Sequence, residues 1–574
     1  MLSWRDAAYR SCTKGHGTWR GVKLSDVMHR SIAFVGAGPT TIYTLHALLA
    51  AMRGQAAITV YEAQSHAGLG TPYRPGWNDP AMLSNIASVE IPPIRETLCA
   101  WLARQPRATL LRLGVDPDAI DPQTFYPRVT LGAYFRDQFD WLIASARQRG
   151  MTVEVVTGVR VTDIRAEGNR ICLSLSPRSG AAFERAHDDV VLATGHQWPE
   201  EPEVKPGYFL SPWPATALNR IPPTAVGILG SSLTAIDAAV TLAIRHGAFV
   251  ETEDEALRYR VDPHADDFAI TMLSRKGLLP EADFYHPLPY EPLARCTPEA
   301  VSALIERGGT DLLDCAFALF CDELAAADPD YADAIGLSDV TLESFADRYF
   351  TDRMAADPFD WAAADLARAR IDFENGHTVP WRYAVLRMHE VLALIAPHLD
   401  ETALERFNTA LKPVFVDAYA TVPHLSIERM LALHRAGRLE VVALGHGSNI
   451  DTRSESGAVV TIDGRRRHFP AFIDATGQHA LGAEAFPFPT LLAQGVVEDA
   501  EQADGAGIKG IVVDAQFRPV SAHPARERMF CLSIPFLLQR HPFLQGITSS
   551  HEMGVIVGTE LAEVADAAAL EAAA

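Results

Sequence analysis

The hydrophobic and polar positions of the chain alternate between strand and helix patterns from Ser31 onward. An apolar run, Ser31–Val35, leads into Gly36-Ala37-Gly38, and a helical pattern follows. The next apolar run ends in Val60-Tyr61-Glu62. A strand, a glycine turn, a helix and a second strand ending in an acid form the βαβ order that binds dinucleotides. The pattern therefore predicts an α/β chain that begins with a dinucleotide-binding unit.

The residue types at this first corner each suit the predicted unit. Gly36 permits the tight turn, and Gly38 lets the backbone approach a pyrophosphate at the helix N-terminus. Glu62 is placed to accept hydrogen bonds from ribose hydroxyls. The third glycine of the usual pattern is replaced by Thr41. We therefore expect the strand and the helix to pack slightly farther apart than usual.

A second corner of the same kind lies between two Ala-Thr-Gly segments. Short apolar strands end in Ala193-Thr194-Gly195 and in Ala475-Thr476-Gly477, and Thr224–Val240 lies between them. Gly230 ends the strand of this corner, and Ser232 takes the second glycine position. The repeat predicts an α/β fold with two Rossmann-like dinucleotide-binding domains, the second inserted in the first.

The strand after the second corner, Phe268–Ser274, is followed by Arg275 and Lys276. An acid at this point favours the free 2′-hydroxyl of NAD, whereas cations offer charge-assisted hydrogen bonds to the 2′-phosphate of NADP. The two cations therefore favour NADPH. The alternative is that they are a solvated strand end.

A mostly helical stretch follows, with apolar residues at three- and four-residue spacing and acidic faces. It is either a substrate lid or a dimerisation surface of a homo-oligomer. The predicted organisation is a flexible leader (1–30, unless the chain starts at Met28), the first dinucleotide-binding domain (31–210), the second (211–280), the helical insertion (281–438) and a segment that completes both domains and ends in a helix (439–574).

Composition and charge restrict the partners that the chain is expected to have. It is 48% hydrophobic and 21% charged over 574 residues, as in ordinary globular proteins. A net charge of −22 repels phosphate backbones and anionic lipids, so neither nucleic acid nor a membrane is an expected partner. The seven cysteines are scattered without a CxxC pair, which indicates reduced thiols, a cytoplasmic location and no zinc site. HExxH and GxSxG motifs are also absent, so the chemistry is expected to come from a cofactor.

Several motifs recur in order along most of the chain, namely GAGP, GLGTPY, LSNIAS, YPRVTLGAYFRDQF, ATGH, SPWP, LTAID, SRKGLLP and DATG. Together they resemble the FAD/NAD(P)-binding proteins of the flavin-monooxygenase-like superfamily. Within that group the chain resembles the amino-acid N-hydroxylating monooxygenases, one branch of which oxidises aspartate. The resemblance covers Ser31–Pro280 well and Gly437–Glu563 moderately.

This resemblance implies an enzyme that uses FAD and NADPH. A flavin C4a-hydroperoxide, formed from dioxygen, would transfer an oxygen atom to the nucleophilic nitrogen of a small amine, typically an amino acid and in one branch aspartate. Two other functions stay open, an FAD-dependent NAD(P)H oxidoreductase that does not oxygenate and a non-catalytic FAD-binding sensor. An amine substrate would require acidic contacts from the helical insertion.

The resemblance also implies positions for the cofactors. Asn85 would donate a hydrogen bond to the flavin or its hydroperoxide, with the capping of a turn as an equal alternative. The final helix, after Gly546, would point its positive end at the flavin. No metal ligand is expected. The residues implied to bind cofactors are Gly36, Gly38, Pro39, Thr40, Glu62, Leu83, Arg128, Thr194, Gly195, Gly230, Ser231, Ser232, Arg275, Lys276, Gly477, Gly546 and Ile547.

Overall fold

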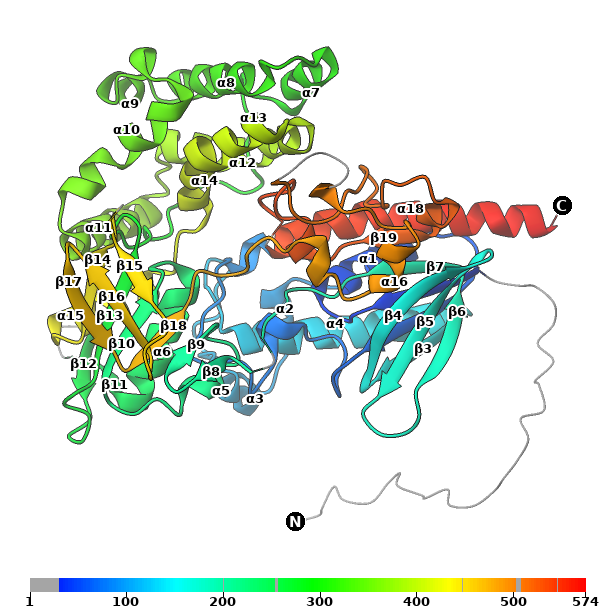
Figure 1. Cartoon of the computed structure of the whole chain (residues 1–574), viewed down its shortest axis with the longest axis horizontal. Helices are drawn as coiled ribbons and strands as arrows, with labels where there is room; N and C mark the ends of the chain where they lie inside the picture. The colour runs from blue at the N-terminus through cyan, green and yellow to red at the C-terminus, as the bar shows by residue number, and fades with distance from the viewer. Residues whose placement is uncertain are drawn as a thin grey trace.

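The computed structural model describes residues 30–199, 201–252, 257–445, 447–501, 507–544 and 546–573. The chain forms two domains built on parallel sheets and a helical part that stands above the second sheet in Figure 1. The predicted α/β fold is confirmed. The leader expected at residues 1–30 lies outside the described residues except for Arg30, which begins the first strand.

The first domain contains a five-stranded sheet of order β19-β7-β1-β2-β3, in which every neighbouring pair is parallel. Its strands are β1 (Arg30–Val35), β2 (Ala56–Glu62), β3 (Thr152–Thr157), β7 (Asp189–Leu192) and β19 (Met529–Cys531). An antiparallel sheet between β3 and β7 consists of β4 (Val159–Glu167), β5 (Arg170–Pro177) and β6 (Phe183–His187). The helices are α1 (Pro39–Ala51), α2 (Leu98–Ala103), α3 (Arg107–Arg112), α4 (Arg128–Gln148), α16 (Pro489–Ala493) and α18 (Ile547–Ala573).

Two glycines of α18 let this helix lie directly on α1. A Cβ atom on Gly554 would lie 2.7 Å from the Cβ of Tyr43, and one on Gly558 would lie 2.5 Å from the carbonyl oxygen of Thr44. Side chains at these two positions would therefore push the helices apart. The contact returns the C-terminal part of the chain to the first domain, with α18 running along α1 in Figure 1.

Thr41, at the position of the missing third glycine, is fully buried at the start of α1. Its hydroxyl donates a hydrogen bond of 2.7 Å to the carbonyl oxygen of Gly36. The larger side chain thus holds the glycine turn against the first turn of the helix.

The second domain contains a six-stranded sheet of order β14-β13-β10-β18-β9-β8, parallel except for the β8–β9 pair. Its strands are β8 (Glu203–Lys205), β9 (Tyr208–Phe209), β10 (Ala225–Leu229), β13 (Ala269–Ser274), β14 (Leu439–Ala443) and β18 (Ala471–Asp474). Further elements are α5 (Ala215–Leu218), α6 (Leu233–His246), the pair β11 (Gly247–Glu251) and β12 (Leu257–Val261), and the antiparallel strands β15 (Asn449–Asp451), β16 (Ala458–Ile462) and β17 (Arg465–Phe469).

The chain order of the strands confirms that the second domain is inserted in the first. All strands of the six-stranded sheet fall between β7 and β19 of the first sheet. The structure differs from the expected boundary at residue 210, because β8 and β9 precede it and already belong to the second sheet. These strands are too short to produce a recognisable pattern, and they are defined by the backbone pairing of β9 with β18 and of β8 with β9.

The helical insertion divides between two cores. The helices α11 (Pro358–Asn375) and α15 (His424–Arg435) contribute Phe359, Ile427 and Met430 to the core of the second domain. The remaining helices share a separate core and are called the middle domain below. They are α7 (Pro298–Arg307), α8 (Leu312–Ala327), α9 (Pro329–Ala334), α10 (Leu342–Ala355), α12 (Pro380–Leu392), α13 (Glu401–Arg406) and α14 (Lys412–Tyr419).

Candidate active site

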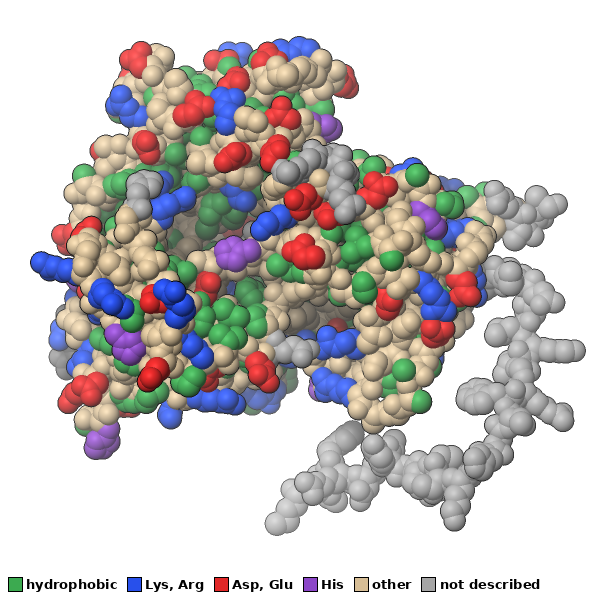
Figure 2. Space-filling model, viewed as in Figure 1, with side chains coloured by type: hydrophobic (Ala, Val, Ile, Leu, Met, Phe, Trp, Pro, Cys, Tyr) green, Lys and Arg blue, Asp and Glu red, His purple; other side chains and the backbone are tan. Residues whose placement is uncertain are grey.

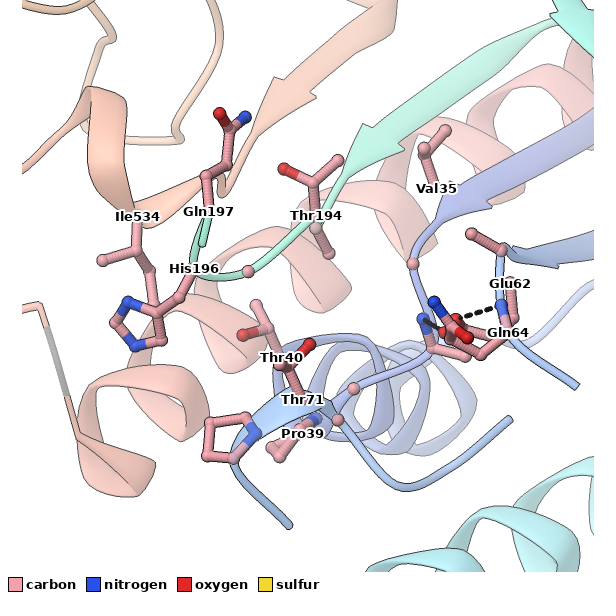
Figure 3. Close-up of a pocket in the computed structure, with 18 of the residues that line it drawn as sticks. Val35, Pro39, Thr40, Glu62, Gln64, Thr71, Thr194, His196, Gln197 and Ile534 are labelled. Atoms are coloured by element: carbon pink, nitrogen blue, oxygen red, sulfur yellow. Dashed lines mark hydrogen bonds between the residues drawn. The ribbon is translucent and has the colours of Figure 1, made fainter. Parts of the chain in front are cut away.

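The first cavity, of about 580 Å³, lies at the carboxyl ends of β1, β2 and β7. Ligands of open parallel sheets bind at this edge. The start of α1, the loop after Leu69 and the N-terminal end of α18 complete its walls. Figure 3 shows Glu62 on one side of this cavity and Thr194, His196 and Gln197 on the opposite side.

The corner at β1 has a shape that only glycine allows. Gly36 has a φ of +104°, and a Cβ atom on it would lie 2.2 Å from the carbonyl oxygen of Ala193. A Cβ on Gly70 would lie 2.7 Å from the ring of Pro39. Gly38, the N-cap of α1, has no side-chain cap, so the first amide groups of the helix face the cavity without a local acceptor. Such amides and the helix dipole suit a pyrophosphate.

Glu62 is fixed at the edge of this cavity by two backbone amides. Its Oε2 accepts a hydrogen bond from the amide of Ala37 at 3.2 Å, and its Oε1 accepts one from Gln64 at 2.9 Å (Figure 3). Each carboxylate oxygen keeps a further lone pair for a ribose hydroxyl. This is the position that the sequence predicts for the ribose contact.

The N-terminal end of α18 closes the same cavity from the far end of the chain. Gly546, Ile547 and Ser550 line it, and the hydroxyls of Thr40 and Ser550 are 3.2 Å apart. On the other side, Thr194 shares a hydrogen bond of 2.8 Å with the hydroxyl of Ser533. The glycine corner, the Glu62 carboxylate and the N-termini of α1 and α18 provide the hydrogen-bond donors and acceptors that an adenine dinucleotide needs. FAD therefore fits this site.

A second cavity of about 290 Å³ adjoins the first. The two share Tyr73, His196 and Ile547 among their lining residues, so the second cavity opens at the end of the first that the final helix closes. Gly477 also lines it. Asn85 lines it with an exposed side chain, and no hydrogen bond joins its amide group to another described residue. Its two interpretations, a flavin contact and a turn cap, both stay predictions.

Three carboxyl groups line the second cavity, those of Glu90, Asp283 and Glu390. Burial raises the pKa of Asp283 to about 7, and the Thr421 hydroxyl donates a weak hydrogen bond of 3.3 Å to its Oδ1. Burial also raises the pKa of Glu90 to about 8, and the negative charge of Asp283 adds to that rise. Among the described residues, neither carboxyl has an ion-pair partner within 4.0 Å. Sequence reasoning missed both groups.

The remaining wall of the second cavity is rich in rings, with Phe284, His286, Tyr290, Tyr419 and Phe543. The centroid of the Tyr290 ring lies 5.4 Å from that of His286, and the guanidinium carbon of Arg387 lies 4.2 Å from the centroid of the Tyr290 ring. Burial lowers the pKa of His286, so this imidazole is neutral at pH 7. Carboxyl groups surrounded by aromatic rings make this cavity suited to binding an organic cation.

Two predicted flavin residues have other contacts. Arg128 donates a hydrogen bond of 2.6 Å to Asp237 of α6 and another of 3.2 Å to the carbonyl oxygen of Leu83. Burial raises the pKa of Asp237 to about 6, against the opposing charge of Arg128. Arg128 lines the second cavity, whereas Leu83 lines none of the three cavities described here. The Arg128–Asp237 pair joins the first domain to the second.

A third cavity, of about 640 Å³, collects the five residues predicted for the nicotinamide coenzyme, Gly230, Ser231, Ser232, Arg275 and Lys276. Gly230 has a φ of +117°, and a Cβ on it would lie 2.9 Å from the carbonyl oxygen of Ala475. Ser232 is the N-cap of α6 and provides no side-chain cap to that helix. The serine in place of the second glycine thus leaves the helix amides available to a phosphate.

Family models match two parts of the chain. One described as FAD-NAD(P)-binding covers residues 33–197, and one described as the YdhS-like middle domain covers residues 297–419. The protein YdhS of Escherichia coli K12 is 39% identical over 525 residues, which are 92% of this chain and 96% of that protein. The chain belongs to the YdhS family. The FAD-NAD(P)-binding match confirms FAD and a nicotinamide coenzyme as the expected cofactors of this YdhS-family protein.

Solved structures with a similar fold include two ornithine hydroxylases. The reduced form of PvdA from Pseudomonas aeruginosa has a TM-score of 0.49 and 15% identity, covering 94% of the YdhS-family chain and 99% of its own. KtzI from Kutzneria sp. 744 has a TM-score of 0.48 and 14% identity, with the same coverage. At these identities the likeness transfers neither a substrate nor a residue role to this chain.

The described part of the YdhS-family chain holds no group of three or more potential metal ligands. Its cysteines at 99, 172, 296, 315, 321 and 531 are free thiols. Among the helices that the structure describes, none is long and apolar enough to cross a bilayer.

Proposed function

We propose that this YdhS-family protein is an FAD-dependent, NADPH-consuming monooxygenase that oxygenates the nitrogen of a small cationic amine. The observation that carries the proposal is the second cavity, where unpaired carboxyl groups meet the end of the FAD site. The FAD would supply the redox chemistry, taking hydride from the coenzyme and activating dioxygen. The chain's own residues would bind the amine, orient it and hold its proton.

The charges in the second cavity favour a cation over aspartate. The carboxyl groups of Glu90 and Asp283 line the cavity without an ion-pair partner among the described residues, and the third carboxylate, Glu390, is paired with Arg387. The lining cation Arg128 is paired with Asp237. A substrate with two carboxylates would bring like charges together and would find no unpaired cation among these lining residues. An ammonium group would instead provide the counter-charge that the half-buried carboxyl groups of Asp283 and Glu90 lack among the described residues.

The raised pKa values of Asp283 and Glu90 also suit proton transfer. An ammonium nitrogen has no lone pair, so the amine must lose a proton before it attacks oxygen. An ionised Asp283, with its pKa raised to about 7 by burial, would pair with the ammonium and accept that proton at its carboxylate. Glu90, with a pKa raised to about 8 by burial, is mostly protonated at pH 7 and would accept a proton only as the pH rises toward 8. The rings around them exclude water from the transfer.

The experiment that tests the proposal measures NADPH oxidation by the FAD-loaded protein in air. The panel contains diamines, basic amino acids and aspartate, each at saturating NADPH. We expect a diamine or basic amino acid to raise the rate of oxidation and aspartate to leave it unchanged. Oxidation that no amine raises would favour the reductase or the sensor, and stimulation by aspartate alone would contradict the cationic substrate.

The half-buried carboxyl group of Glu90 should make the stability of the protein depend on pH. Its pKa is raised to about 8 in the folded protein by burial, from 4.5 in the unfolded chain. The folded state therefore binds more protons than the unfolded state between these values, and stability falls as the pH rises. Glu90→Gln removes this titration. We expect the melting temperature of the variant, relative to the native protein, to be higher at pH 8 than at pH 5. A difference that stays constant between these two pH values would contradict the raised pKa.

A further inference from the structure

The third cavity has a second wall that comes from the middle domain. Phe350, Arg353, Asn408 and Lys412 line it opposite the β10 corner and the end of β13. All four belong to the segment matched as the YdhS-like middle domain. Figure 2 shows a hollow beneath the middle domain in this view, with Lys and Arg side chains at its rim.

Three cations in this cavity have no carboxylate partner among the described residues. Arg275 and Lys276 follow β13, and Lys412 begins α14. The Nζ of Lys276 lies 3.3 Å from the centroid of the Phe350 ring, and burial, followed by the charge of Arg275, lowers its pKa to about 8. Burial alone lowers the pKa of Lys412. Three such charges in one cavity of a protein with a net charge of −22 indicate a polyanionic ligand.

The nearby acid is already neutralised. Asp417 lies on α14 and lines the same cavity, but its Oδ2 accepts hydrogen bonds of 2.6 Å from Arg353 and 3.0 Å from the Tyr349 hydroxyl. Arg353 also donates to the carbonyl oxygen of Leu279 at 2.7 Å. This buried pair holds α14 against the second domain and leaves the charge of Lys412 uncompensated.

The backbone before Lys412 supports a binding role. Phe407–Leu411 form a π-helical turn between α13 and α14, a local irregularity that is frequent at functional sites. Asn408, in that turn, lines the cavity, and its side-chain oxygen is buried without a hydrogen-bond partner. A buried amide oxygen without a donor costs free energy unless a ligand supplies the donor.

We propose that the middle domain completes the NADPH site, with Lys412 as a phosphate ligand opposite Arg275 and Lys276 and with Asn408 as an acceptor for a hydroxyl or amide of the coenzyme. This inference rests on the proposed use of NADPH and extends it to a domain whose sequence has no dinucleotide-binding motif. The shared chemistry is a phosphate, which is either the 2′-phosphate or the pyrophosphate.

The test compares Lys412→Met with Lys412→Arg and with Lys509→Met in the FAD-loaded protein. Lys509 is an exposed lysine that lines none of the three cavities. Dissociation constants for NADP⁺, NAD⁺ and adenosine 2′,5′-bisphosphate are measured by calorimetry. We expect Lys412→Met to weaken NADP⁺ binding at least about tenfold, as for a lost charge-assisted bond, while Lys412→Arg and Lys509→Met stay within about threefold.

The pattern over the three ligands identifies the phosphate. Weaker binding of NADP⁺ and the bisphosphate with unchanged NAD⁺ places Lys412 at the 2′-phosphate, and equal weakening of NADP⁺ and NAD⁺ places it at the pyrophosphate. Since burial of the Lys412 charge disfavours folding, Lys412→Met should melt no lower than the native protein. Unchanged NADP⁺ affinity in that variant would overturn this inference alone. A native protein that binds neither coenzyme would contradict the proposed function as well.

Discussion

Gly36→Ala is expected to purify without FAD. The new Cβ would lie 2.2 Å from the carbonyl oxygen of Ala193, a backbone atom at the end of β7 that cannot move aside alone. The φ of +104° adds strain for any residue with a Cβ. Relief of both effects requires the β1 corner to move away from the pyrophosphate position. We expect flavin absorbance at 450 nm to fall to less than about a tenth of the native value, because the turn that would bind the pyrophosphate is displaced.

The matched control for this variant is Gly168→Ala. Gly168 has a φ of +59° in the turn between β4 and β5, and a Cβ there would meet nothing within 4 Å. The Gly168→Ala variant tests backbone strain without the steric clash. The strain should lower the free energy of unfolding by about 1 kcal/mol, and the variant should keep its FAD. Glu62→Gln supplies a milder variant that keeps the turn and weakens the ribose contact. Native flavin content in Gly36→Ala would contradict the assignment of the first cavity to FAD.

Asp283→Asn is expected to raise the KM of the amine by roughly 10- to 100-fold, the effect of losing one hydrogen bond to a charged group. The native 1/KM should rise between pH 6 and pH 8, because the carboxyl, with a pKa raised to about 7, ionises over that range. An alkyl ammonium keeps its charge there, with a pKa near 10. The variant should lose that pH dependence along with its affinity.

Asp267→Asn is the matched control, since Asp267 is exposed in the loop before β13 and lines no described cavity. It removes the same charge and should leave both KM and its pH profile unchanged. An unaltered KM in Asp283→Asn, or an equal rise in both variants, would show that the second cavity does not bind the amine through this carboxyl.

The location of the residues at the ends of the βαβ strands could be predicted from the sequence. The positions of Gly36, Glu62 and Gly230 depend on a few neighbouring residues, and the structure places these three residues in cavities at the carboxyl ends of the strands. The insertion of the second domain was predictable for the same reason, because the motif repeats in order. The glycines of α18 that contact α1 had no such local signal, since their effect depends on a partner distant in sequence.

The second cavity could not be predicted, because its walls come from distant segments. Glu90 ends a short 3-10 turn of the first domain, Asp283 lies in the segment between β13 and α7, and Glu390 lies in the last turn of α12 in the middle domain. Each carboxyl alone resembles a solvated acid in an acidic chain. Lys412 likewise resembles a solvated lysine at a helix start, and only the packing of α14 shows its burial. The need for acidic contacts was predictable from an amine substrate, but the residues were not.

If NADPH supplies the electrons for oxygenation of a cationic amine by dioxygen, the stoichiometry of the reaction will show it. NADPH consumed, hydrogen peroxide released and N-oxygenated product formed are measured together for the amine that raises the rate of oxidation, with ¹⁸O₂ as the oxygen source. We expect one ¹⁸O atom in the product for each NADPH oxidised and little peroxide. NADPH oxidation whose electrons all appear in peroxide, with no ¹⁸O in the amine, would contradict it.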